Sequence, residues 1–321
     1  MAQAENKDNQ AITVVGGGLM GASIASLFTS AGHPVTVLEV DATRRAALSD
    51  LIHSQIDDIE SLTPGSTSHA ARVPVTIAGD LHAAVSLADV VIESVTEDRT
   101  VKESVWAAIG ASASPTAILA TNTSSLSVTE LAHLVPMPSR VLGVHFFNPA
   151  HFLPGVEVVV LEQTDPLVVE SVMNLLAGAG KDPVKVKDTP GFVVNRLQFV
   201  LIAEAMRLID EGVATPEDID RLVETTIGPR WLAGGPMISA DAAGLDVYVS
   251  ILRELQDKLG DHYQPPEIIA ALVDKGSLGA KTGSGLITDS ADFYTSSQAS
   301  RFAKLRRILQ TLRGDTNSAA M

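Results

Sequence analysis

A glycine-rich turn near the N-terminus, Gly-Gly-Gly-Leu-Met-Gly at residues 16–21, constrains the fold of this chain more than any other feature. It has the G-x-G-x-x-G form, follows a β-branched run at residues 12–15 and precedes residues 22–30, which suit a helix that ends at Gly32. In a strand–turn–helix unit the backbone N–H groups of such a turn face a pyrophosphate. The pattern therefore predicts a dinucleotide-binding unit whose cofactor contacts include Gly16, Gly18, Leu19, Met20 and Gly21.

An acidic residue, Glu39, closes the next β-branched segment at residues 35–39. A carboxylate at this place accepts hydrogen bonds from the adenosine ribose hydroxyls and repels the 2′-phosphate of NADP, so we expect NAD as the cofactor. Two alternatives stay open. Arg44 and Arg45 can reach a phosphate from the following helix, and methyltransferases with a Rossmann-like fold can also use an acid at this position.

Short apolar runs alternate with helix-length segments through the first half of the chain. The expected strands also include residues 90–95, 118–121, 141–146 and 156–161. This alternation predicts an α/β fold with a Rossmann-type doubly wound sheet.

The pattern changes after Asp188-Thr189-Pro190-Gly191, where residues 192–211 suit a long helix and Thr215-Pro216-Glu217-Asp218 forms a capping box. We therefore expect an NAD-binding Rossmann domain at residues 1–189. A smaller all-helical domain, for substrate binding and dimerisation, is expected at residues 190–321.

Composition excludes several classes of function. With 321 residues the chain suits two domains, and its 38 acidic against 23 basic residues give a net charge of −15, which disfavours nucleic acid and anionic membranes. Cysteine is absent, which excludes disulfides and thiolate zinc sites and suits a cytoplasmic protein. No cluster with metal-ligand spacing is present, so no metal is expected. Residues 11–32 carry no charge, but the glycines at positions 16, 17, 18 and 21 argue against a membrane span or a signal peptide.

Five motifs, in order and at matching spacing, resemble those of the 3-hydroxyacyl-CoA dehydrogenase family over nearly the whole chain. They are the glycine turn, Ala-Asp-Val-Val-Ile-Glu-Ser-Val-Thr-Glu at 88–97, Thr-Asn-Thr-Ser-Ser-Leu at 121–126, His-Phe-Phe-Asn-Pro at 145–149 and Lys-Asp-Thr-Pro-Gly-Phe-Val-Val-Asn-Arg at 187–196. The resemblance implies NAD-dependent, reversible oxidation of an L-3-hydroxyl group to a 3-keto group, and a homodimer formed through the C-terminal domain.

The same resemblance implies roles for individual residues. His145 is the general base, Glu157 orients it, and Ser124 and Asn195 bind the reacting oxygen. Histidine suits this role because it titrates near neutrality; His151 is the competing candidate. Further cofactor contacts, expected near the nicotinamide half, are Glu97, Lys102, Asn122 and Asn148.

The chain departs from the acyl-CoA members of the family in two ways. It has no lysine between Lys7 and Lys102, where those members contact the CoA nucleotide, and it carries Asp57, Asp58 and Glu60 in that stretch. These acids repel the phosphates of CoA. Pro154 and the Gly-Pro-Arg-Trp segment at 228–231 resemble instead the branch that handles free hydroxy acids, such as L-gulonate and L-carnitine dehydrogenases.

We therefore expect a small free 3-hydroxy acid or a related alcohol as substrate. Arg230 is a candidate for binding its carboxylate, because a guanidinium can hold a carboxylate through two parallel hydrogen bonds. Two alternatives remain: an L-3-hydroxyacyl-CoA dehydrogenase, and a non-catalytic NAD-binding protein like the lens crystallins of this superfamily.

Overall fold

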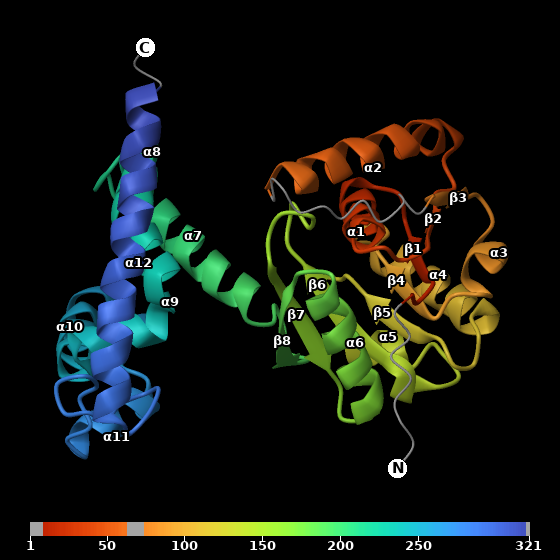
Figure 1. Cartoon of the computed structure of the whole chain (residues 1–321). Coiled ribbons are helices and arrows are strands. Elements are labelled where there is room, and N and C mark those ends of the chain that lie inside the picture. The colour runs from red at the N-terminus through yellow and green to blue at the C-terminus, as the bar shows by residue number, and fades with distance from the viewer. Residues whose placement is uncertain (1–8, 63–73, 319–321) are drawn as a thin grey trace. The chain divides into compact units, whose positions relative to one another are not determined.

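The computed structural model describes residues 9–62 and 74–318 of the chain. The chain divides into two compact units, Met1–Leu201 and Ile202–Met321. The first unit contains the sheet, and the second contains only helices and their connections among the residues described (Figure 1). The boundary expected at residues 189 and 190 lies in the loop before the helix that runs through residue 201.

The first unit is built on one eight-stranded sheet with the strand order β3-β2-β1-β4-β5-β6-β7-β8. The strands are β1 Ile12–Val15, β2 Val35–Leu38, β3 Thr76–Ala78, β4 Val90–Glu93, β5 Ile118–Thr121, β6 Val141–Phe146, β7 Gly155–Val160 and β8 Asp182–Lys187. All neighbouring strands are parallel except β6 and β7. Since β1 pairs with both β2 and β4, the strand order reverses there. In such sheets ligands bind beyond the carboxyl ends of the strands at this reversal.

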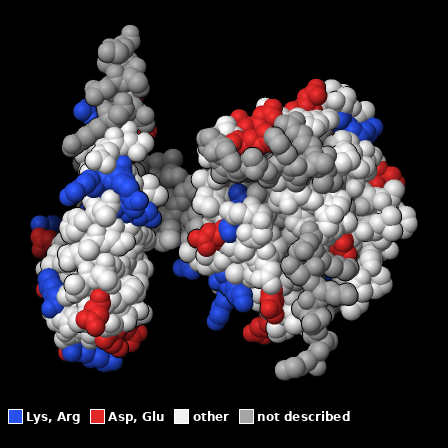
Figure 2. Space-filling model, viewed as in Figure 1, with Lys and Arg blue, Asp and Glu red and all other residues white. Residues whose placement is uncertain are grey.

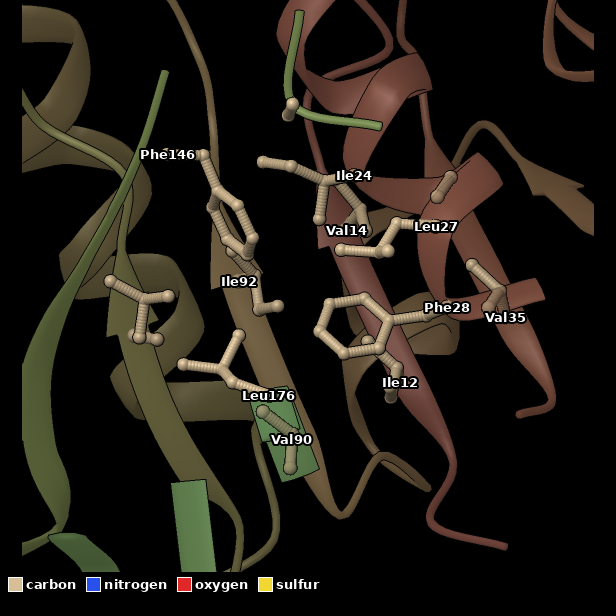
Figure 3. Packing of buried hydrophobic residues seen from close by; sticks show 14 of the residues in the cluster. Ile12, Val14, Ile24, Leu27, Phe28, Val35, Val90, Ile92, Phe146 and Leu176 are labelled. Atoms are coloured by element: carbon tan, nitrogen blue, oxygen red, sulfur yellow. The ribbon is translucent and has the colours of Figure 1, made fainter. Parts of the chain in front are cut away.

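Helices cover both faces of this sheet, and the buried apolar residues form one cluster on each face. One face packs against α1 (Leu19–Ser30), α2 (Ala42–Leu62) and α6 (Pro166–Gly178), whose buried residues include Ile52 of α2. Figure 3 shows Phe28 of α1 and Leu176 of α6 in this cluster. The other face packs against α3 (Leu81–Val85), α4 (Arg99–Ser112) and α5 (Val128–Ala132). Successive residues of a strand point to opposite faces, so strands buried on both sides are mostly apolar.

The expected Rossmann-type sheet is therefore confirmed, with corrections to individual elements. The strands predicted at residues 118–121 and 141–146 have those bounds, whereas β3 and β8 were not predicted. The helix α1 begins at Leu19, three residues before the predicted start. The strand predicted to reach Val95 ends at Glu93, because the Val95 N–H turns back to donate to the Glu93 side chain at 2.8 Å.

The long helix predicted at residues 192–211 is α7, Val194–Asp210. It begins two residues later than predicted because Phe192 has φ of 49°, outside the helical region. Positive φ is uncommon for a bulky residue, and Phe192 is held there by burial, with 3% of its surface exposed.

The second unit continues with α8 Pro216–Leu222, α9 Gly228–Ala243, α10 Leu245–Leu259, α11 Glu267–Asp274 and α12 Ala291–Ser318. Thr215 caps α8 by accepting a hydrogen bond from the Asp218 N–H, as the capping box predicts. A kink at Gly235, with φ of 71°, divides α9, and α12 packs along α9 (Figure 1). None of the helices in the described ranges is long and apolar enough to cross a membrane.

Candidate active site

The glycine turn joins β1 to α1 at the point where the strand order reverses. Gly16 has φ of 112°, and a Cβ there would lie 2.6 Å from the Ser94 carbonyl oxygen. A Cβ on Gly21 would collide with the Gly16 carbonyl oxygen, whereas open space surrounds Gly18 at the start of α1. The turn thus packs closely against the sheet and exposes the N–H groups at Leu19 and Met20 for an anionic group.

Glu39 lies beside this turn, just beyond β2. It is buried, and a Cβ added to Gly17 would lie 3.1 Å from Glu39 Oε2. Oε1 accepts hydrogen bonds from the Asp41 N–H at 2.8 Å and from Arg44 at 3.3 Å. Arg45 donates to the Glu39 and Val40 carbonyl oxygens. Both arginines that could favour NADP are therefore engaged by the Glu39 segment. This geometry fits the adenosine ribose of NAD.

A buried charge network occupies the carboxyl ends of β4 and β5. Glu93, fully buried, accepts hydrogen bonds from Lys102 Nζ at 2.7 Å, Trp106 at 3.1 Å and Thr121 at 2.7 Å. Lys102 also pairs with Glu97 at 3.2 Å. The Lys102 ammonium thus forms ion pairs with two carboxylates, and 1% of the Lys102 side chain is exposed. It is placed to orient Glu97 rather than to reach a ligand itself.

Glu97 in turn organises the loop that carries Ser124. Its Oε1 accepts hydrogen bonds from the Thr123 hydroxyl, from the N–H groups of Ser124 and Ser125, and from the Ser125 hydroxyl at 2.5–3.0 Å. Burial alone would raise the pKa of Glu97, but the Thr123 hydrogen bond and the Lys102 charge lower it to about 2. A carboxylate that is ionised at neutral pH therefore fixes this loop.

Ser124 and Asn195 lie together in the first unit. Asn195, in the first turn of α7, donates to the Ser124 carbonyl oxygen at 3.0 Å. Within the described ranges the Ser124 hydroxyl has no hydrogen-bond partner, so it can donate to a ligand. Asn122 ties the same loop to neighbouring strands: its side chain donates to the Ser94 hydroxyl and accepts from the Phe146 N–H. Asn148 is exposed just beyond β6.

His145 and Glu157 are direct cross-strand partners in the antiparallel pair β6 and β7. This register brings together two residues that are twelve positions apart in the chain. His145 Nδ1 lies 2.7 Å from Glu157 Oε2, and both side chains are buried. Because an ionised carboxylate only accepts hydrogen bonds, Nδ1 is the donor and Nε2 is left as an acceptor.

Two backbone groups hold the other oxygen of Glu157. The N–H groups of Val193 and Val194 donate to Glu157 Oε1 at 2.9 Å each. These donors follow Phe192, whose ring centroid lies 5.6 Å from that of His145, and Phe147 packs at 4.6 Å on the same imidazole. The positive φ of Phe192 thus turns the chain so that the Val193 and Val194 N–H groups point toward Glu157. The arrangement can take a proton at His145 Nε2 and stabilise the resulting imidazolium.

The competing base, His151, has a different environment. Its Nδ1 lies 2.7 Å from the Ser23 hydroxyl in α1, which also accepts from the His151 N–H at 2.9 Å. Burial lowers the pKa of His151, with Asp58 opposing and Lys181 reinforcing the effect. His151 therefore ties its loop to α1 as a neutral side chain.

The roles of two residues, the buried Glu93 and the partly buried Asp188, were not predicted from the sequence. Glu93 interrupts an otherwise apolar strand, which was the available signal for a functional carboxylate. Asp188 accepts from the Ser127 hydroxyl and from the Thr129 N–H and hydroxyl, and so fixes the start of α5. Across the described parts of the chain, no group of three or more His, Asp or Glu residues is placed to hold a metal ion.

Arg230, the residue expected to bind a substrate carboxylate, lies in the second unit. Arg230 is exposed near the start of α9, on a cavity formed with α12, and Trp231 beside it is 42% exposed. Lys281, in the glycine-rich segment at residues 276–286, pairs with Asp246 at 2.8 Å. The buried Asp241 accepts from the N–H groups of Leu286 and Ile287, which holds this segment against α9.

Comparison with known proteins gives matches over both units. Residues 11–189 match the NAD-binding domain described for 3-hydroxyacyl-CoA dehydrogenase, and residues 191–289 match the C-terminal domain of that family. The chain is 32% identical to 5-formyl-3-hydroxy-2-methylpyridine 4-carboxylate 5-dehydrogenase of Mesorhizobium japonicum, covering 93% of this chain and 98% of that protein.

Two further relatives are hydroxyacyl-CoA dehydrogenases. The mitochondrial hydroxyacyl-coenzyme A dehydrogenase of Sus scrofa is 34% identical, over 85% of this chain and 89% of its own length. The solved structure of 3-hydroxyacyl-CoA dehydrogenase from Archaeoglobus fulgidus is similar with a TM-score of 0.77 and 30% identity, covering 94% of this chain and 99% of that one.

Proposed function

Because the chain belongs to the 3-hydroxyacyl-CoA dehydrogenase family, whose members are NAD-dependent enzymes, we propose that it reversibly oxidises the 3-hydroxyl group of a small free hydroxy acid. The buried hydrogen bond of 2.7 Å between His145 and Glu157 carries this proposal. It supplies a base with a fixed tautomer near the carboxyl end of β6, inside a dinucleotide-binding sheet.

Each group of the chain has a distinct task in this reaction. His145 Nε2 takes the proton of the substrate hydroxyl while a hydride leaves the carbon that bears it. Glu157 stabilises the imidazolium, and Ser124 and Asn195 bind the reacting oxygen. When bound, the nicotinamide supplies the hydride acceptor. Glu97 and Lys102 act as positioning residues, since they form an ion pair with each other and Glu97 accepts hydrogen bonds from the loop at residues 123–125.

The glycine turn and Glu39 fit the other half of NAD. The space around Gly18 admits the pyrophosphate, and the Glu39 carboxylate beside Gly17 accepts the ribose hydroxyls. Asn122 and Asn148 complete the proposed cofactor contacts near the carboxyl ends of β5 and β6.

A free acid is favoured over a CoA thioester by charge. Asp57, Asp58 and Glu60 are exposed on α2, and acidic side chains gather over this helix in Figure 2. Arg44 and Arg45, at the other end of the helix, are bound to the Glu39 segment. Negative side chains on this helix repel the phosphates of CoA and so weaken its binding. The Mesorhizobium relative is named for a substrate with a carboxylate and no CoA.

An L-3-hydroxyacyl-CoA substrate is the second candidate, because several relatives are named as dehydrogenases of that class. The His145–Glu157 pair serves both substrates equally, since the reacting carbon is the same. The two candidates differ only in the group carried beyond that carbon, and Arg230 is the residue we assign to a free carboxylate.

We also propose a cytoplasmic homodimer formed through the helical domain. In this proposal the boundary between the two domains lies in the loop between β8 and α7, near residue 189. Exposed apolar side chains on α7 support the dimer: Leu197, Phe199, Val200 and Met206 are each 56–63% exposed. The absence of cysteine suits a reducing compartment.

The experiment that tests the catalytic assignment compares His145→Gln with His151→Gln. We expect His145→Gln to lower kcat by about 100-fold or more while the Kd for NADH stays unchanged, because it removes only the proton acceptor. The matched control His151→Gln retains kcat, provided its circular dichroism spectrum shows that it is folded. Equal loss of NADH binding and turnover in His145→Gln would contradict the assignment.

A further inference from the structure

A cavity of about 220 Å³ lies between α9 and α12 in the second unit. Its polar lining consists of Arg230 and Ser239 from α9 and Gln298 and Arg301 from α12, and Phe302 and Leu305 are among its apolar walls. Ligand sites for drug-sized molecules occupy roughly 300–1,000 Å³. The cavity therefore suits a small organic molecule and is too small for a nucleotide.

Arg301 is held in this cavity by α9. Its Nη2 donates to the Ser239 hydroxyl at 3.0 Å, and its Nη1 lies 3.4 Å from the Ile238 carbonyl oxygen. Its Nε is buried and has no hydrogen-bond partner among the described residues. Because Nε packs against Gly234, the donors that remain for a ligand are those on Nη1 and Nη2.

A glycine of α9 makes this placement of Arg301 possible. A Cβ added to Gly234 would collide with Nε of Arg301. Gly234 is the first residue of the Gly-Gly-Pro-Met segment at residues 234–237, where α9 is kinked. The helix α12 begins at Ala291, beyond residue 289, where the match to the family's C-terminal domain ends. Arg301 thus lies beyond the residues that the family's C-terminal domain matches.

The two guanidinium groups lack negative partners. Neither Arg230 nor Arg301 forms an ion pair within the described ranges, although the chain has an excess of 15 acidic residues. Residues 293–314 contain no acid, and Lys and Arg side chains gather on this part of α12 in Figure 2. A negatively charged ligand can therefore pair with these two arginines.

We propose that Arg230 and Arg301 form a binding site for the carboxylate of a small organic acid. The planar fork of each guanidinium matches a carboxylate, Gln298 and Ser239 add polar neighbours, and Phe302 and Leu305 cover the aliphatic part. The carboxylate belongs either to the substrate, which rests on the function proposed above, or to a second acid that binds independently of turnover.

The test compares Arg301→Gln and Gly234→Ala with Arg307→Gln, an exposed arginine on the same helix. The probes are 3-hydroxybutyrate and its uncharged methyl ester. We expect calorimetry to show about 10- to 100-fold weaker binding of 3-hydroxybutyrate to Arg301→Gln, a loss typical of one charged hydrogen-bonding partner. Gly234→Ala weakens binding in the same direction, and Arg307→Gln does not.

Kinetics then identify the source of the carboxylate. A rise in KM for 3-hydroxybutyrate without a change for the ester assigns the site to the substrate. Weaker binding with unchanged KM assigns it to a second acid. Equal effects on acid and ester, or unchanged calorimetric binding in Arg301→Gln, would overturn the proposal. Because calorimetry needs no turnover, it also separates failure of this site from failure of the proposed activity.

Discussion

At the scale of single residues, the proposed preference for NAD over NADP depends on the contact between Glu39 and Arg44. The carboxylate of Glu39 lies against Gly17 and holds Arg44 at 3.3 Å. The side chain of Glu39 is 5% exposed, while that of Arg44 is 64% exposed. We therefore propose that Glu39 accepts the ribose hydroxyls and also keeps the exposed Arg44 guanidinium away from a 2′-phosphate.

Replacement of Glu39 by Ala should relax the preference for NAD. It removes the repulsion of the 2′-phosphate and releases Arg44, so we expect the ratio of kcat/KM for NAD to that for NADP to fall by about tenfold or more. The measurement is steady-state NAD and NADP reduction with the same substrate. Adding Arg44→Ala should reverse part of the change, and an unaltered ratio in Glu39→Ala would remove Glu39 from the cofactor site.

The residues of the site differ in how far sequence alone predicts them. His145 and Glu157 are recognisable from the resemblance, but their contact depends on β6 and β7 being antiparallel with one particular register. Neither the register nor the burial of Lys102 between two carboxylates follows from local residue pattern. The structural role of His151 likewise depends on its contact with Ser23, 128 positions away in the chain.

At the scale of elements, the loop at residues 122–126 is stabilised by one carboxylate. Glu97 receives four hydrogen bonds from Thr123, Ser124 and Ser125 and contacts Lys102. Ser124 is therefore positioned by Glu97 through its backbone, and the buried Glu93 positions Lys102 in turn.

This loop should make stability depend on acid pH. The pKa of Glu97 is about 2 in the folded protein and 4.5 in the unfolded chain, so the unfolded chain binds the proton first. The contribution of Glu97 to the free energy of unfolding is fully present above pH 4.5 and is lost as the pH falls toward 2. We expect the Tm of Glu97→Gln to fall less steeply than that of the wild type in this window, and its kcat at neutral pH to be lower.

The control for this prediction is Glu103→Gln, which removes an exposed carboxylate from α4. It should leave the dependence of Tm on pH close to that of the wild type. Identical pH profiles for Glu97→Gln and the wild type would show that the carboxylate does not anchor the loop.

Strands with a clear apolar pattern were predicted closely, whereas very short or polar ones were not. The strands β5 and β6 are mostly apolar and buried along their whole length. In contrast, β8 reads Asp-Pro-Val-Lys-Val-Lys at the edge of the sheet, where one pairing partner and exposed side chains permit a polar sequence. The strand β3 has only three residues, too few for a periodic signal.

At the scale of the whole molecule, the exposed apolar side chains of α7 predict self-association. Phe199→Glu should convert a dimer into a monomer in light scattering, because an interface cannot accommodate an unpaired carboxylate without a large desolvation cost. The matched control is Leu87→Glu, at a residue 87% exposed in the first unit. Met206→Glu gives an independent second variant, and a monomeric wild-type protein would contradict the proposal.

The central claim is that this member of the family oxidises a free hydroxy acid rather than a CoA thioester. The charge of −15 and the acids on α2 act against CoA, while Arg230 and Arg301 favour a carboxylate. The most direct test measures NAD reduction by the wild-type enzyme with 3-hydroxybutyryl-CoA and with free 3-hydroxy acids, sugar acids and carnitine. We predict the highest kcat/KM for a free acid; far more efficient turnover of 3-hydroxybutyryl-CoA than of every free acid would contradict this account.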